Sequence, residues 1–116
     1  MSLVLRAAAV VTPDAVLRPG WMQVDGAIIA GVGAGEPPAG DVVDLGDAVL
    51  VPGFVDVHCH GGGGASFGAD AEASARAAHA HAAHGTTTLV ASLVSGPRER
   101  IAREIAALTP LVQDDV

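Results

Sequence analysis

Apolar residues in the first fifty positions of the chain occur in short runs that are separated by turn signals. Pro13-Asp14, Pro19-Gly20 and Gly46-Asp47 are such signals, and Asp25-Gly26 is the dipeptide that marks a two-residue hairpin. The runs, rich in Val, Leu, Ile and Ala, lie at residues 3–11, 21–24, 27–31, 42–45 and 48–50. We therefore expect residues 1–50 to form a small β unit, which needs packing partners because two or three hairpins alone are marginally stable.

After residue 50 the pattern changes to strands that alternate with helices. An apolar run at 51–60 precedes an Ala-rich, helix-favouring segment at 71–84, with Asp70 as its N-cap and Gly85 at its end. A β-branched, apolar run at 85–93 is typical of a buried parallel strand.

A second helix is predicted to begin near Pro97. Its apolar stripe consists of Ile101, Ile105 and Leu108, and Pro110 marks its end or a kink. The order strand, helix, strand, helix predicts a parallel sheet with right-handed crossovers, and hence an α/β fold.

The strand at 51–60 carries the candidate chemistry of the chain. Because side chains alternate along a strand, Asp56, His58 and His60 should point to one side and Cys59 to the other. Two imidazoles that start roughly 7 Å apart at the backbone can converge on one metal ion at about 2.0–2.1 Å. Asp56 is then a candidate partner that orients a histidine from behind. Cys59, with the opposite parity, is expected to pack as a small apolar residue.

The remaining glycine and histidine patterns favour structural roles. Gly61, Gly62, Gly63 and Gly64 are expected to form a flexible turn beside the metal site. Phosphate binding by this loop is the weaker alternative, since no P-loop lysine follows and no helix starts at once. A His-x-His pair also occurs by chance without a metal, and that alternative stays open.

Three more histidines lie in the first predicted helix, at His79, His81 and His84. Spacings of two and five residues do not line one helical face as i, i+4 would. We therefore expect solvated or helix-end side chains here, without a ligand role.

Composition removes several classes of function. The formal net charge of the 116 residues is −7, and the six basic residues are all Arg and form no stripe, so nucleic acid is not an expected partner. No apolar run reaches the length of a membrane span. One Cys excludes an internal disulfide and suits a reducing cytoplasm. The chain is also far shorter than the about 250 residues of a (β/α)8 barrel.

The stretch Pro52-Gly53-Phe54-Val55-Asp56-Val57-His58-Cys59-His60, with its glycine run, resembles the strand-1 metal motif of the amidohydrolase superfamily. Glycines directly after the second histidine are similar to the N-acetylglucosamine-6-phosphate deacetylase family. Dihydroorotase-like members usually carry an Arg shortly after the pair, and none occurs here before Arg76.

The resemblance implies a fold larger than this chain. Residues 51–116 would be the first two β/α units of a (β/α)8 TIM-like metal-dependent hydrolase barrel, and residues 1–50 the N-terminal part of a small β-sandwich domain. It implies one or two divalent ions, with zinc favoured, and His58 and His60 as ligands. The remaining ligands and the catalytic acid/base would lie downstream, so no catalytic residue is assigned here and the fragment alone is expected to be inactive.

The implied reaction is hydrolysis of N-acetyl-D-glucosamine 6-phosphate to D-glucosamine 6-phosphate and acetate, by a cytoplasmic enzyme that the family suggests is a homodimer. Two alternatives remain. One is another amidohydrolase, such as a dipeptidase or a cyclic amidase, and the other is a non-catalytic, truncated β/α module.

Overall fold

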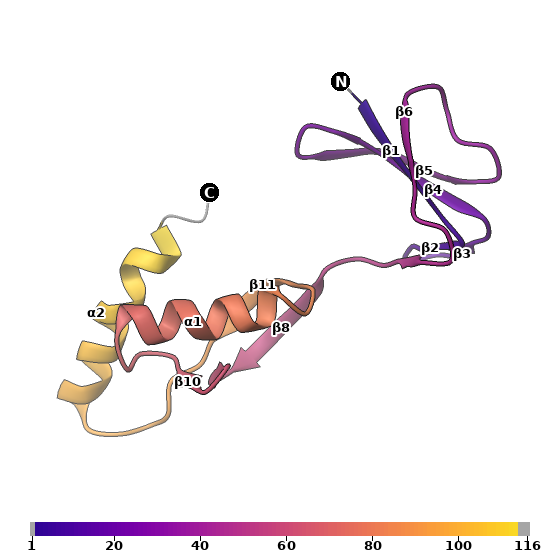
Figure 1. Cartoon of the computed structure of the whole chain (residues 1–116). Coiled ribbons are helices and arrows are strands. Elements are labelled where there is room, and N and C mark those ends of the chain that lie inside the picture. Colours follow the sequence, from indigo (N-terminus) through magenta and orange to yellow (C-terminus); the bar gives the residue numbers. More distant parts are fainter. Residues whose placement is uncertain (1, 114–116) are drawn as a thin grey trace. The chain divides into compact units, whose positions relative to one another are not determined.

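The computed structural model describes residues 2–113 of the chain. The chain divides into two compact units, Met1–Pro52 and Gly53–Val116, which are drawn in indigo to magenta and in magenta to yellow (Figure 1). Each unit is described by itself below.

The first unit is all β. A four-stranded sheet has the order β5-β4-β1-β6, and a smaller sheet has the order β3-β2-β7. The strands are β1 (Ser2–Ala7), β2 (Ala9–Val11), β3 (Val16–Leu17), β4 (Gly20–Asp25), β5 (Ile28–Ala34), β6 (Asp41–Asp44) and β7 (Val49–Leu50). Its buried side chains are Val4, Ala7, Ala9 and Val10.

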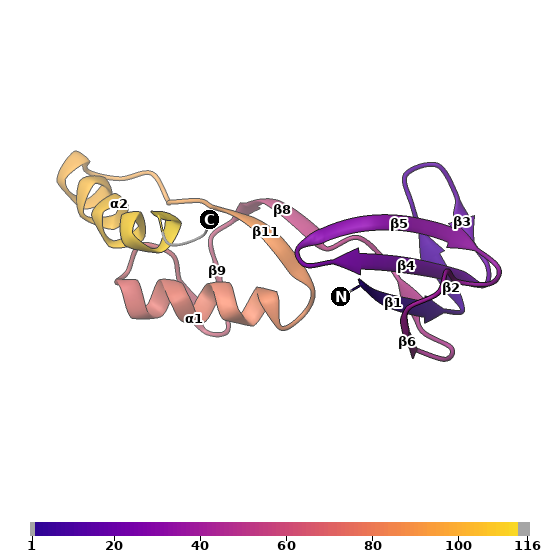
Figure 2. The same ribbon diagram turned by 90° about the horizontal axis from the view of Figure 1, so that it is seen from above.

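The β4–β5 hairpin confirms the expected antiparallel pair (Figure 2). Asp25 stands opposite Ile28, and Gly26 is in the left-handed region at φ 60°. The turn residues are therefore Gly26 and Ala27, one position later than predicted. The expected continuous strand at 3–11 is broken at Ala8. The Ala8 N–H donates to the carbonyls of Gly46 and Ala48, at 3.1 and 3.0 Å. On either side of Ala8, β1 and β2 belong to different sheets.

The last two strands of this unit pair with its beginning. β6 runs parallel to β1, with Leu3 opposite Asp41, and β7 runs parallel to β2, with Ala9 opposite Val49. Parallel partners need long connections, and here the β3–β5 segment supplies them. Turn signals alone, which favour neighbouring antiparallel pairs, did not reveal this arrangement.

The second unit contains the predicted order of strand, helix, strand and helix. β8 pairs in parallel with β11, and α1 is the crossover between them (Figures 1 and 2). The elements are β8 (Phe54–Cys59), β9 (Gly61–Gly62), β10 (Ala65–Ser66), α1 (Ala71–Ala82), β11 (Thr86–Ala91) and α2 (Arg98–Gln113). The core joins Cys59, Phe67 and Ala77, and Leu89 and Leu108 pack against it.

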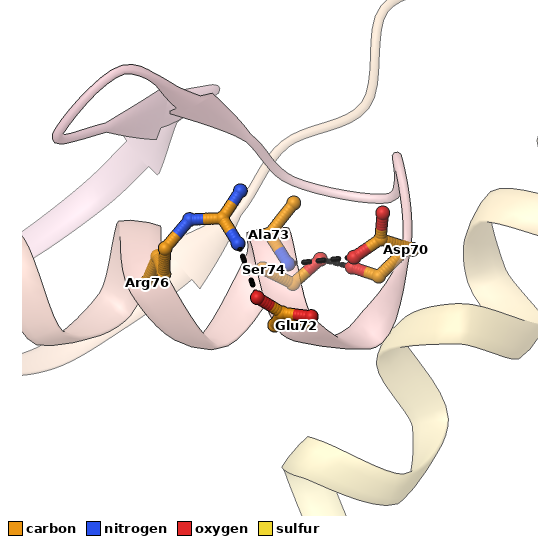
Figure 3. A network of polar contacts seen from close by, with 5 residues as sticks. All are labelled: Asp70, Glu72, Ala73, Ser74 and Arg76. Atoms are coloured by element: carbon orange, nitrogen blue, oxygen red, sulfur yellow. Dashed lines mark hydrogen bonds and ion pairs between the residues drawn. The ribbon is translucent and has the colours of Figure 1, made fainter.

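Helix α1 begins at the expected cap. The Asp70 side chain accepts from the Ala73 N–H at 2.6 Å, and the Ser74 hydroxyl donates to the Asp70 carbonyl at 2.7 Å (Figure 3). Ser74 Oγ also accepts from the Gly68 N–H at 3.0 Å, which fixes the loop before the helix. The helix ends two residues before the predicted His84, and Gly85 follows at φ 94°.

The first hydrogen bonds of helix α2 run from the N–H groups of Arg100 and Ile101 to the Pro97 carbonyl. Pro110 lies inside the helix, which continues to Gln113. Of the two predicted roles, an end at the proline is therefore wrong, and a kink stays a prediction. Among residues 2–113, no helix is long and apolar enough to cross a membrane.

Candidate metal centre

The two predicted ligands converge at the end of β8. His58 lies in the strand and His60 directly after it, and both side chains are exposed. Their Nε2 atoms lie 3.1 Å apart, with ring centroids 5.0 Å apart and ring planes inclined by 56°. The imidazoles therefore present the same nitrogen to one point in space.

This geometry fits a shared cation. Two nitrogens that each bind one ion at about 2.1 Å lie roughly 3.0–3.4 Å apart for bond angles between 90° and tetrahedral. The measured 3.1 Å falls in that interval. Two neutral imidazoles at this distance need a proton or a cation between their lone pairs. The pair is thus compatible with a metal site and equally with a single N–H···N hydrogen bond.

The glycines after His60 form a defined hairpin rather than a loose loop. β9 and β10 pair antiparallel, with Gly62 opposite Ala65, and Gly63 and Gly64 form the turn at φ 56° and 76°. Positive φ at both central residues is the geometry that suits two-residue hairpins. The Phe67 N–H donates to the His60 carbonyl at 3.0 Å, which ties the hairpin to the histidine. The expected turn is therefore present as the tip of a hairpin, and its flexibility stays a prediction.

Asp56 lies elsewhere than strict alternation predicts. The pairing of β8 with β11 shifts register between Leu89 and Ala91, which stand opposite Asp56 and Cys59. An irregularity of this kind re-aims side chains. The Asp56 carboxylate accepts from the backbone N–H of His58 at 3.1 Å and has a ligand atom within 4.8 Å of Cys59 Sγ. It therefore supports the backbone of His58, and its role behind an imidazole stays a prediction.

Cys59 is buried, as its parity predicts, but it does not pack against apolar groups alone. Its Sγ lies 3.2 Å from His81 Nε2 and 3.5 Å from the Gly61 carbonyl oxygen. His81 Nε2 lies 3.0 Å from the same oxygen. With Asp56, these side chains form a compact group whose ligand atoms lie within 4.8 Å of one another.

His81 is thus the residue that sequence reasoning missed. We expected a solvated helix histidine, whereas the side chain is half-buried and points at the glycine hairpin. A Cβ on Gly62 would stand 2.6 Å from His81 Nε2, so the small residue makes room for the ring. His79 and His84 are exposed, and His84 Nδ1, just after α1, donates to the Ala80 carbonyl of that helix at 2.8 Å.

No family model matches the chain, but solved structures and a curated protein are similar to it. The crystal structure of N-acetyl-D-glucosamine-6-phosphate deacetylase from Mycobacterium smegmatis has a TM-score of 0.89 and 47% identity, and covers 97% of this chain and 32% of that protein. A mutant of the enzyme from the same organism, in complex with N-acetyl-D-glucosamine-6-phosphate, has a TM-score of 0.89 and 46% identity, over 97% of this chain and 30% of that one.

A curated relative gives the same name. The N-acetylglucosamine-6-phosphate deacetylase of Bacillus subtilis (strain 168) is 33% identical over 64 residues, which are 53% of this chain and 16% of that protein. The chain is therefore similar to these deacetylases along nearly its whole length, shares their mixed α/β fold, and spans about a third of the solved proteins that it matches.

Proposed function

We propose that this chain is the N-terminal part of an N-acetylglucosamine-6-phosphate deacetylase, which hydrolyses N-acetyl-D-glucosamine 6-phosphate to D-glucosamine 6-phosphate and acetate. The observation that carries the proposal is the 46–47% identity to two deacetylase structures over 97% of the chain. In this proposal β8, α1, β11 and α2 are the first two β/α units of a (β/α)8 barrel. The first unit of the chain is then part of a small β-sandwich domain.

His58 and His60 are the residues that would hold the divalent ion, and imidazole nitrogen is a donor that zinc prefers. When bound, such an ion polarises an amide carbonyl and lowers the pKa of a water molecule. Both rings are exposed at the end of β8, which is where barrel enzymes bind their substrates.

The other residues of this region keep the pair in place. The Asp56 carboxylate accepts a hydrogen bond from the N–H of His58, and the Phe67 N–H donates one to the carbonyl of His60. Both ligands are thus fixed through their backbone, which limits the reorganisation needed when the ion binds. The general base is not among these groups. In this proposal it would be an Asp after the eighth barrel strand, as the family resemblance implies, outside these 116 residues.

The test compares purified full-length protein with His58→Ala, His60→Ala and the double variant, by acetate release and by metal content. Each single change removes a ligand, so we expect a loss greater than the about 10–100-fold typical of an outer partner. Asp56→Asn should be milder than either. Chelation should abolish activity and metal add-back should restore it, and the unphosphorylated sugar should react much more slowly.

His79→Ala and His84→Ala are matched controls, because His79 is exposed on α1 and His84 is exposed just after its end. They should retain activity and metal content. Full activity in a metal-free His58→Ala/His60→Ala variant would overturn the assignment of the pair.

A further inference from the structure

A second group of donor atoms lies on the buried side of β8, apart from the exposed His58 and His60. It consists of Cys59 Sγ, His81 Nε2, an Asp56 carboxylate oxygen and the carbonyl oxygen of Gly61. We propose that Asp56, Cys59 and His81 form a separate binding site for a zinc-like divalent cation, with the Gly61 carbonyl beside it. This site goes beyond the deacetylase function and does not depend on it.

The distances are those of a coordination shell. Sγ and Nε2 are 3.2 Å apart, and the Gly61 oxygen is 3.0 Å from Nε2 and 3.5 Å from Sγ. A triangle with these sides has a point about 1.9 Å from all three atoms. Zinc bonds to sulfur at about 2.3 Å and to nitrogen at about 2.0–2.1 Å, so an ion fits slightly out of that plane. An Asp56 carboxylate oxygen lies within 4.8 Å of both Cys59 Sγ and a ring nitrogen of His81 and would be the carboxylate ligand.

The chemistry of the donors selects the ion. Thiolate and imidazole favour zinc-like ions over magnesium or calcium, which take oxygen ligands. On binding, the Cys59 thiol gives its proton to solvent and a metal–sulfur bond forms. His81 offers the Nε2 lone pair while its ring proton resides on Nδ1. Asp56 Oδ1 already accepts from the His58 N–H, and the carboxylate has a second oxygen for the ion.

The surroundings suit a structural site. Cys59 is 6% exposed and packs with Phe67 and Ala77, whereas Asp56 and His81 are partly exposed. The donors come from three segments of the chain, β8, β9 and α1. An ion here would hold the hairpin and the end of β8 against the last turn of α1. Without it, hydrogen bonds to the Gly61 carbonyl hold the same groups together.

Cobalt titration tests the proposal, because a thiolate-to-cobalt charge-transfer band that depends on Cys59, the one cysteine among these 116 residues, reports this site. We expect the band when Co²⁺ is added to the full-length protein, and we expect it to persist in His58→Ala/His60→Ala. Cys59→Ser should lose it. His81→Gln should weaken Co²⁺ binding by more than about tenfold, because losing even a residue that only hydrogen-bonds to a ligand typically lowers metal affinity by that factor. His84→Gln is the matched helix control and should leave the band unchanged.

Thiol protection gives a readout that needs no change at Cys59. In the His58→Ala/His60→Ala variant, Zn²⁺ should slow alkylation of Cys59 by at least about tenfold, the threshold used for His81. The absence of a charge-transfer band in folded protein, a band that His81→Gln leaves intact, or unprotected alkylation would each overturn the proposal. A protein without deacetylase activity that still shows the band would refute the proposed function and leave this site standing.

Discussion

Gly61→Ala should damage the hairpin behind His60 far more than the same change three residues later. Gly61 has φ 152°, a positive value that residues with side chains rarely adopt. A Cβ there would stand 2.2 Å from the Ala65 carbonyl oxygen and 2.8 Å from Ser66 Cα. Both atoms belong to the backbone of β10, so neither can turn away, and the two strands must separate.

The size of the effect can be worked from these two terms. A backbone outlier costs on the order of 1–3 kcal/mol, and overpacking against fixed atoms costs a further 1–3 kcal/mol, which together give about 4 kcal/mol. Gly64 has φ 76°, and a Cβ there meets nothing within 4 Å. Gly64→Ala should therefore cost only the left-handed term of about 1–2 kcal/mol. The difference of about 2–3 kcal/mol is roughly 30–150-fold in an opening equilibrium.

Hydrogen exchange at the Phe67 amide measures that equilibrium, because this N–H donates to the His60 carbonyl next to the hairpin. In full-length protein its exchange should accelerate at least tenfold more in Gly61→Ala than in Gly64→Ala, a margin of about 1.4 kcal/mol. Metal content should fall in the same order, because His60 loses its backbone support. Equal exchange rates in the two variants would refute the steric argument.

Two further predictions concern stability. Asp70→Ala removes the cap that accepts from the Ala73 N–H, so it should destabilise α1 by about 1 kcal/mol in urea unfolding. Glu72→Ala breaks only an ion pair between exposed side chains, and a loss as large as that of Asp70→Ala would contradict this reasoning. Residues 1–116 produced alone should not be a cooperatively folding monomer, since β8 leaves Val55 and Val57 63% and 71% exposed. Sedimentation as a monomer with a sharp thermal transition would show otherwise.

The helices and the histidine pair were predictable because local patterns decide them. The cap at Asp70 and the alanines after it favour a helix at α1 from local sequence alone. Alternation over His58 and His60 likewise needs only an extended backbone for the two rings to converge. In both cases the residues that determine the structure lie within a few positions of one another in the sequence.

Long-range features were not predictable in this way. The register shift beside Asp56 and Cys59 depends on how β11 pairs with β8. No residue type within β8 predicts this shift from the sequence. His81 seemed solvated because its spacing defines no helical face, yet its position in the last turn brings it to the hairpin. The absence of a side chain at Gly62 was the available sign that a ring packs there. It can be interpreted only once the glycine hairpin and the last turn of α1 are known to be in contact.

The parallel strands of the first unit set an order in which that unit can be completed. The β4–β5 hairpin joins residues three positions apart, whereas β1 and β2 pair with partners about forty residues later. Closing the longer loop costs on the order of 2 kcal/mol more chain entropy. During synthesis at about 5–20 residues per second, the N-terminal strand therefore waits roughly 2–8 s for its neighbour. Throughout that interval the edge of β1 that β6 will cover stays open, and a chaperone or a second nascent chain would find its binding surface there.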